Sequence, residues 1–120
     1  MRRNSCYASE AVHGFAGVGD SAPELIPGDW SGGSGRIIRL KCKLLTGAST
    51  NCTIYVRNDI AGTDKWTELA SVTGAFDGDG IMSANVAIES PYAGPMYFYA
   101  SCWGSAAAWT ADLEVWVEVD

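Results

Sequence analysis

The residue types that usually act as nucleophiles, bases or phosphate ligands are few in this sequence and form no motif. The only histidine, His13, has no serine or cysteine spaced around it as a nucleophile would be. The acidic residues fall on the polar side of an expected strand or in loops, which favours solvated surface charge over a glycosidase pair. Gly14, Gly17 and Gly19 precede no helix of the kind that a phosphate-binding loop needs. We therefore expect a protein that is not an enzyme and has no catalytic residues.

The four cysteines, Cys6, Cys42, Cys52 and Cys102, are separated by long and irregular gaps. Without a Cys-x-x-Cys pair, a structural zinc site is not expected. Three of them, Cys42, Cys52 and Cys102, fall on apolar faces of expected strands and are interpreted as small buried hydrophobic residues. The amino terminus lacks the apolar run of a secretory signal, so we expect synthesis in a cytoplasm, where thiols stay reduced. A disulfide between Cys42 and Cys52 after release from the cell stays open.

One short segment has carboxylates at the spacing that a hard cation such as calcium uses. Asp77-Gly78-Asp79-Gly80 alternates two aspartates with glycines on a tight turn. The further ligands of a calcium loop are missing from the flanking sequence, so we interpret the segment as a turn. We expect no metal and no cofactor.

Large aromatic residues are more informative about function. Tyr97, Tyr99 and Trp103 lie on one expected strand and Trp116 on another, all on the side opposite the core. Aromatic residues in such a row usually mark an interface, because monomers rarely leave a large apolar patch in water. Three alternatives remain: a loop or the amino-terminal segment covers them, they form subunit contacts, or they stack on sugar rings.

The charge is distributed unevenly along the chain. The net charge of −6 at pH 7 argues against a nucleic-acid binder, which needs a basic face for phosphates. Residues 36–57 carry five basic and no acidic residues, whereas residues 59–120 carry ten acidic residues and one lysine. Two rows of matching spacing result, a basic row of Arg39, Lys41 and Lys43 and an acidic row of Asp112, Glu114 and Glu118. They are either cross-strand partners within one molecule or contacts between molecules.

Polar and apolar residues alternate with a period of two over most of the chain after residue 35, which predicts β-strands. The expected strands cover residues 35–45, 52–57, 66–72, 82–89, 96–103 and 112–120. In the first of them, Ile38, Leu40, Cys42 and Leu44 are expected to point inward. The short turn of residues 46–51 predicts a hairpin that places Cys42 opposite Cys52.

Residues 1–35 show neither a helical nor a strand period and contain scattered Gly, Ser and Pro. We interpret them as an extended Gly/Ser-rich amino-terminal arm, joined to the domain of residues 36–120 by the Ser31–Gly35 hinge. Leu25, Ile26 and Trp30 are costly to leave in water, so they should pack on the domain or on a partner.

Six strands with one apolar face each need two sheets that cover one another. The predicted fold class is therefore all-β, a small antiparallel β-sandwich of the jelly-roll or Greek-key kind with an extended N-terminal arm. The 120-residue length suits one such domain, and no segment is apolar enough to span a membrane.

A short chain with a Gly-rich arm and a small β-sandwich ending in LEVWVEVD resembles the capsid decoration, or cement, proteins of tailed bacteriophages in overall organisation. The resemblance implies a virion structural protein that is made in the host cytoplasm, binds the outer surface of the head and bridges major capsid subunits as a homo-oligomer, a dimer or a trimer. On this interpretation the interface comprises Leu25, Ile26, Trp30, Arg39, Lys41, Lys43, Tyr97, Tyr99, Trp103 and Trp116.

The alternative is a carbohydrate-binding module or a tail-associated receptor-binding domain. Tyr97, Tyr99, Trp103 and Trp116 would then stack on sugar rings, while acidic residues would hydrogen-bond the hydroxyl groups. Such a protein should respond to glycans as an isolated domain, whereas a decoration protein should prefer a repeating protein lattice.

Overall fold

The computed structural model describes residues 3–8, 12–14, 24–26, 35–60, 62–89, 96–105 and 108–119, and for the first three of these ranges it describes the backbone alone. Nine strands lie within these residues: β1 Arg3–Ala8, β2 Val12–Gly14, β3 Glu24–Ile26, β4 Gly35–Thr46, β5 Asn51–Asp59, β6 Trp66–Ala75, β7 Ile81–Ile88, β8 Met96–Trp103 and β9 Trp109–Val119. No helix that could cross a membrane occurs in this described part.

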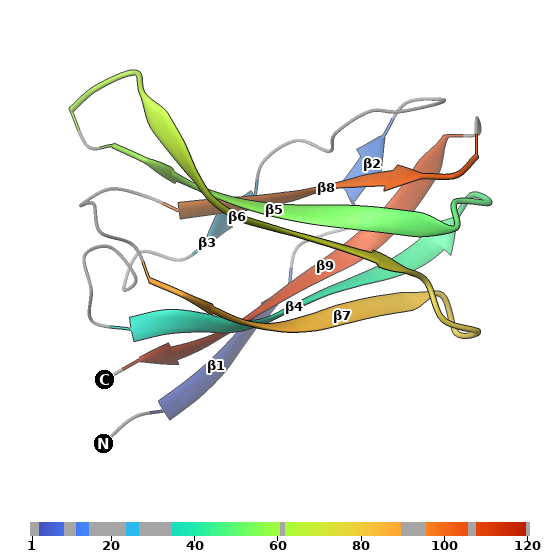
Figure 1. Cartoon of the computed structure of the whole chain (residues 1–120), viewed down its shortest axis with the longest axis horizontal. Coiled ribbons are helices and arrows are strands. Elements are labelled where there is room, and N and C mark those ends of the chain that lie inside the picture. Colours follow the sequence, from blue (N-terminus) through green and yellow to red (C-terminus); the bar gives the residue numbers. More distant parts are fainter. Residues whose placement is uncertain are drawn as a thin grey trace.

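The strands form two antiparallel sheets that pack face to face (Figure 1). Sheet A has the order β1-β9-β4-β7, with β2 also paired to β9, and sheet B has the order β3-β8-β5-β6. Apart from the short β2, this is the strand order of a jelly roll, in which consecutive strands lie in opposite sheets except for the hairpin of β5 and β6. The predicted all-β sandwich is confirmed.

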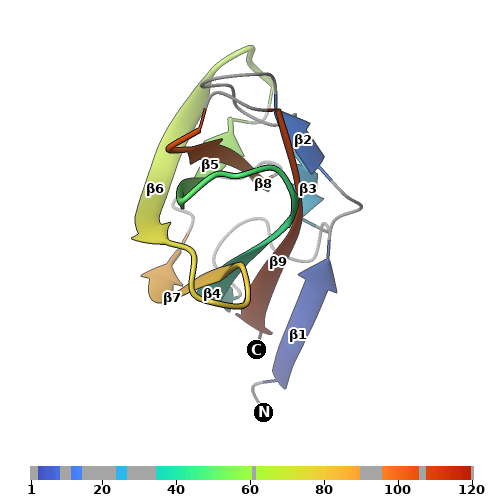
Figure 2. The same ribbon diagram turned by 90° about the vertical axis from the view of Figure 1, so that its right-hand side faces the viewer.

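The first 35 residues contribute strands that the sequence did not reveal. β1 and β2 pair with β9, and β3 pairs with β8, so this segment adds to both sheets. Figure 2 shows β1 running beside β9 at the edge of sheet A. Runs of three to six residues are too short for a period of two to stand out. β4 begins at Gly35, the last residue of the expected arm, and the division into an arm and a domain stays a prediction.

The predicted hairpin between the first two strands of the domain is wrong. β4 pairs with β9 and β7 in sheet A, whereas β5 pairs with β8 and β6 in sheet B. The turn after β4 therefore crosses from one sheet to the other. Gly47 has a φ of 108°, and a Cβ there would meet the Ala108 carbonyl oxygen and the Trp109 Cβ at 3.0 Å. Only glycine fits this crossing without strain.

A β-bulge in β4 changes which of its residues point into the core. Ile37 is fully buried and Ile38 only partly, because the register on both neighbouring strands shifts between Ile37 and Arg39. The extra residue resets the alternation. Leu40 and Cys42 are buried as predicted, and Leu44 packs against the core.

The core fills the space between the sheets. Its largest fully buried side chains include Trp109, Phe98, Ile37, Leu40 and Ile54. They come from β4 and β9 of sheet A and from β5 and β8 of sheet B, so the four central strands supply most of the core. Residues that alternate with them along the same strands must point outward, and these outward residues make the two faces of the molecule.

Candidate interaction surface on the outer face of sheet B

The outer face of sheet B is built by three neighbouring strands in register. Met96, Phe98, Ala100 and Cys102 of β8 are buried, so the residues between them point outward. The register places Tyr97 opposite Arg57, Tyr99 opposite Tyr55, Ser101 opposite Thr53 and Trp103 opposite Asn51. On the other side of β5, Trp66 lies opposite Asp59 and Glu68 opposite Arg57. We call Tyr55, Arg57, Trp66, Tyr97, Tyr99 and Trp103 the aromatic face.

Two tyrosines form a stacked pair in the middle of the aromatic face. The rings of Tyr55 and Tyr99 lie with their centroids 4.9 Å apart and their planes at 15°. Opposed side chains on neighbouring antiparallel strands are close enough for such contact. A stacked pair adds about 1 kcal/mol beyond the area that the rings bury. The two rings are therefore held in one orientation without a partner molecule.

Arg57 lies between two further aromatic rings. Its guanidinium carbon is 5.2 Å from the centroid of Trp66 and 5.1 Å from that of Tyr97, which are cation–π distances. Its Nε also forms an ion pair with Asp59 Oδ1 at 3.1 Å. A register shift between Val56 and Arg57 on the β6 side lets Asp59, two residues after Arg57, lie opposite Trp66. Arg57 thus fixes the positions of two rings and neutralises one carboxylate.

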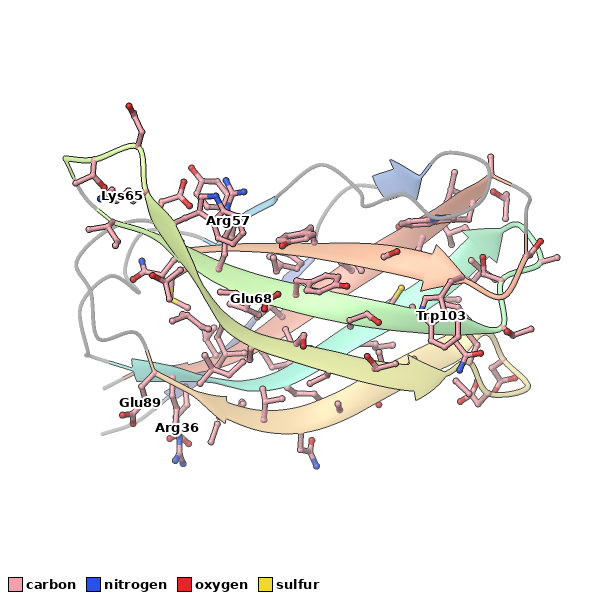
Figure 3. The ribbon with its side chains drawn as sticks, turned by 45° about the horizontal axis from the view of Figure 1, so that its top comes forward. Arg36, Arg57, Lys65, Glu68, Glu89 and Trp103 are labelled. Atoms are coloured by element: carbon pink, nitrogen blue, oxygen red, sulfur yellow. The ribbon has the colours of Figure 1, made fainter. Side chains whose placement is uncertain are left out.

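Two tryptophans remain exposed at opposite ends of this face. Trp66 is 51% exposed and Trp103 is 37% exposed. Their cross-strand partners, Asp59 and Asn51, are eight positions apart on β5, which corresponds to about 26 Å along a strand. Figure 3 shows Arg57 and Trp103 toward the two ends of the sheet. Polar side chains also lie between the two tryptophans, among them Thr53 and Thr73, whose hydroxyl oxygens are 2.9 Å apart.

The outer face of sheet A has a different character, because its charges pair across the β4–β9 ladder. Lys41 Nζ lies 3.2 Å from Glu114 Oε2, and Arg36 Nε donates a 3.1 Å hydrogen bond to Glu118 Oε1. Lys43 stands opposite Asp112 in the register. Two members of each predicted row, Lys41 with Glu114 and Lys43 with Asp112, are therefore cross-strand partners within one molecule. The third members are not, because Arg39 lies opposite Trp116 and Glu118 lies opposite Arg36.

Trp116 does not belong with the other predicted aromatic residues. It lies on β9 in sheet A, opposite Cys6 of β1 on one side and Arg39 of β4 on the other. Its side chain is half-buried, and its indole nitrogen is buried without a hydrogen-bond partner among the described residues. The expected group of Tyr97, Tyr99, Trp103 and Trp116 is thus divided between opposite faces.

Of the three contact residues predicted in the first 35 residues, the structure describes the backbone of two. Leu25 pairs with Tyr97 and Ile26 with Met96 in the β3–β8 register, so the backbone of both residues borders the aromatic face. Trp30 lies outside the described residues. The sequence analysis missed Tyr55, Arg57 and Trp66 as members of the face. Pairing β5 with β8 was the signal needed to find them.

The Asp77–Gly80 segment is a turn. Asp77 Oδ1 accepts hydrogen bonds from the backbone nitrogens of Asp79 at 2.8 Å and Ile81 at 3.0 Å. One of its carboxylate oxygens is therefore used within the turn. No group of three or more His, Cys, Asp or Glu residues placed to hold a metal ion occurs in the described ranges.

No family model matches the sequence, and no curated protein matches it. Among solved structures, the chain is similar to a protein of the disulfide-linked pili of Bacillus endospore appendages, with 17% identity, a TM-score of 0.46 and coverage of 99% of this chain and 86% of that one. It is also similar to the Yersinia pseudotuberculosis-derived mitogen, with 13% identity, a TM-score of 0.45 and coverage of 96% and 86%.

A third similarity is to the VP2 subviral particle of infectious bursal disease virus, with 14% identity and a TM-score of 0.46, covering 98% of this chain but 33% of that one. At TM-scores below 0.5, none of these similarities says what the present chain binds.

Proposed function

We propose that this chain is a non-enzymatic structural protein of a virion, a capsid decoration protein that binds the outer surface of the phage head. In this proposal the aromatic face of sheet B contacts major capsid subunits. The supporting observation is that Trp66 and Trp103 stay exposed on the face that also carries the stacked tyrosine pair and the cation–π contacts of Arg57. The overall organisation of the chain resembles that of decoration proteins, and from this resemblance we take the major capsid protein as the proposed partner.

The physical argument rests on the cost of exposed aromatic rings. Trp66 and Trp103 gain from leaving water, and a ring that is already oriented, as Trp66 is by Arg57, loses little conformational entropy when a partner covers it. Tryptophan, tyrosine and arginine dominate binding energies at interfaces, and the aromatic face consists of these three residue types. On a shell, many such contacts of modest affinity combine, particularly if the protein is a dimer or a trimer with several contacts at once.

The amino-terminal residues extend the same proposal. The β3 backbone borders β8 beside Tyr97, so a partner that covers the aromatic face would also reach this segment. Contacts from Leu25, Ile26 and Trp30 to the neighbouring capsid subunits stay a prediction. Replacement of Trp30 with Ala should weaken binding to particles and leave the circular dichroism spectrum unchanged.

The first experiment is to sediment a lysate of the natural source through a density gradient and identify the proteins of the particle fractions by mass spectrometry. The proposal expects this chain to travel with large particles at a fixed ratio to a shell protein. If it stays with the free proteins at the top of the gradient, the decoration function is wrong.

A second candidate function is glycan binding, which one part of the aromatic face favours. Trp66 offers an exposed ring, and the Arg57–Asp59 pair beside it offers hydrogen-bond donors and acceptors, the combination that sugar hydroxyls require. Titration of the isolated chain with glycans while tryptophan fluorescence is recorded separates the two functions. A saturable fluorescence change that is lost in Trp66→Ala would favour glycan binding. No change in fluorescence would favour binding to a protein lattice.

A further inference from the structure

The outermost strand of sheet B, β6, has a regular and uncharged edge along its second half. β6 is the last strand of this sheet, and among the described residues no strand pairs with its other side (Figure 2). Its register on β5 is unbroken from Ala70 to Ala75. No charged residue lies between Glu68 and Asp77. We call residues 71–75, seen from the side that faces away from β5, the free edge.

The hydrogen-bond pattern shows which backbone groups of β6 face away from the sheet. The Phe76 nitrogen donates to the Thr50 carbonyl oxygen at 2.9 Å, and this pair continues the β5–β6 register. In an antiparallel ladder, hydrogen-bonded pairs alternate with pairs that are not hydrogen-bonded. Counting back from Phe76, the N–H and C=O groups of Ser71, Thr73 and Ala75 therefore point away from β5. These groups are placed to bond a further strand.

The other edge strands in the described part of the chain lack this combination of length, regularity and neutral charge. β2 and β3 are only three residues long, and β1 carries Arg3. The register between β7 and β4 shifts between Ile37 and Arg39. Short length, charge and bulges are the means by which natural proteins prevent an edge strand from pairing with another chain. A smooth neutral edge, in contrast, is a site for strand addition.

The free edge is complementary to a second copy of itself. Antiparallel pairing about a two-fold axis at Thr73 places this residue opposite its own counterpart and Ser71 opposite Ala75 of the second copy. This register uses all three residues whose backbone groups face outward. Moving the axis by one residue would instead require Leu69, the extra residue at the register shift of β6, or Asp77, whose N–H already donates a hydrogen bond within its turn.

The inner side of the free edge fits the same register. Val72 packs against the core but is only partly buried, and the register places it opposite Gly74 of the second copy. A Cβ at Gly74 would lie 2.9 Å from the Met82 Cγ, so the Met82 side chain fills the space over this glycine. Val72 of the second copy would thus meet an apolar side chain, and both copies would bury apolar surface.

We propose that two copies of this chain pair through the free edges of β6, antiparallel and with the two-fold axis at Thr73. The pairing joins the two copies of sheet B into one continuous sheet. Because the axis is perpendicular to this sheet, the two aromatic faces lie on the same side of the dimer. A partner with repeated sites is then held at two places at once. The pairing itself does not depend on the decoration function, since both of its members are this chain.

Acidic residues at both ends of the free edge limit the overlap of the two strands. The antiparallel register brings Glu68 of one copy toward Asp77 and Asp79 of the other. Like charges that face one another oppose pairing, and salt screens them. Salt should therefore strengthen the dimer, whereas it would weaken a dimer held by ion pairs.

The first test is sedimentation velocity of the purified full chain at concentrations up to about 200 µM. We expect a monomer–dimer equilibrium whose upper limit is twice the chain mass of 12.7 kDa, with a dimer fraction that rises when NaCl is raised to about 1 M. A chain that stays monomeric leaves this edge to a strand of another protein and overturns the proposal. A mass that keeps rising beyond the dimer overturns it as well, because a two-fold pair is closed.

Substitutions at Thr73 test whether the free edge is the interface. Thr73→Lys places two like charges at the axis and should raise the dissociation constant of the dimer by about tenfold or more. Thr73→Val keeps a β-branched side chain without charge and is the matched control, which should dimerise as the wild type does. Thermal unfolding of each variant checks that the monomer stays folded. If Thr73→Lys folds and dimerises as well as Thr73→Val, the interface lies elsewhere.

Disulfide cross-linking tests the register and does not depend on that variant. Directly opposed residues of a hydrogen-bonded antiparallel pair have Cα atoms about 5.5 Å apart, which a disulfide can join. Thr73→Cys in a Cys6→Ser background should therefore form a cross-linked dimer with oxidised glutathione, since the three other cysteines are buried. Ser71→Cys alone should not, because its two copies lie about 14 Å apart along the strands.

A mixture of Ser71→Cys with Ala75→Cys should restore the cross-link, because these two positions face one another in the proposed register. Cross-linking of Ser71→Cys with itself, or no cross-link in Thr73→Cys, would contradict the two-fold axis at Thr73. The result leaves the decoration function untouched in either case, because only the purified chain is used.

Discussion

Cross-strand pairing brings different kinds of side chain together on the outer faces of sheet A and sheet B. On sheet A, the register brings Lys41 to Glu114 and Arg36 to Glu118, so these four charges form ion pairs within the molecule. On sheet B, the register brings rings together, as in the Tyr55–Tyr99 stack, while Trp66 and Trp103 stay exposed. A paired charge has little left to offer a partner, whereas a fixed and exposed ring still has apolar area to bury.

This difference shows that a row of like residues is not by itself an interface. The basic row of β4 was a candidate contact on sequence grounds, but the structure places acidic residues of β9 opposite two of its three members, Lys41 and Lys43. Exposed ion pairs contribute about 0–1 kcal/mol and lose part of that in salt. The aromatic face, in contrast, has the composition of an energetic hot spot. We therefore assign the proposed partner contact to sheet B.

The largest expected effect is on partner binding, through removal of the exposed rings. Trp66→Ala and Trp103→Ala should each weaken binding to particles by about 2 kcal/mol, or about thirtyfold, because each removes a ring that the partner would cover. Co-sedimentation with stripped particles measures this loss. The matched control on sheet A is Lys43→Ala, which should bind within about twofold of the wild type. If Lys43→Ala weakened binding as much as the tryptophan variants do, the proposed contact could not be assigned to sheet B alone.

The next effect is on stability, at the centre of the cation–π cluster. Arg57→Ala removes two ring contacts and leaves Asp59 without its ion-pair partner, so the free energy of unfolding should fall by about 1–2 kcal/mol. Urea unfolding followed by tryptophan fluorescence measures the change. Arg57→Lys should recover part of it, because an ammonium group retains the charge and loses the planar stacking. If Arg57→Ala is as stable as the wild type, the rings are not held by Arg57.

A smaller effect is expected at the tyrosine stack. Tyr55→Leu should lower the free energy of unfolding by about 1 kcal/mol, because it removes the ring–ring contact while keeping an apolar side chain. Tyr55→Phe preserves the ring and serves as the control. Thermal unfolding of the two variants compares them directly. A loss in Tyr55→Phe as large as that in Tyr55→Leu would mean that the hydroxyl group, and not the stack, is responsible.

The smallest effect is expected on sheet A. A double-mutant cycle of Lys41→Ala and Glu114→Ala should give a coupling energy of about 0.5 kcal/mol, as exposed cross-strand ion pairs do. The coupling should shrink when the salt concentration is raised to 1 M, where screening is strong. A coupling above about 2 kcal/mol that persists in salt would place the stronger interactions on sheet A and reverse the comparison.

The sequence by itself determined the six strands from β4 to β9, most of their buried residues and the sandwich class. It could do so because the alternation of polar and apolar residues is a local property that follows from the strand period of two. The buried positions of Cys42, Cys52 and Cys102 were identified in this way. The alternation failed where the chain departs from it, at the bulge between Ile37 and Arg39, and where strands are short, in β1 to β3.

Only the tertiary structure decided which strands are neighbours. Alternation defines a face of each strand but not its hydrogen-bonding partner, because pairing joins residues far apart in the chain. The pairing of β4 with β9 placed Lys41 opposite Glu114 and Lys43 opposite Asp112 within one molecule. The pairing of β5 with β8 and β6 assembled Arg57, Trp66 and Tyr97 into one cluster. The same pairing separated Trp116 from the other aromatic residues, because β9 lies in sheet A whereas β5, β6 and β8 lie in sheet B.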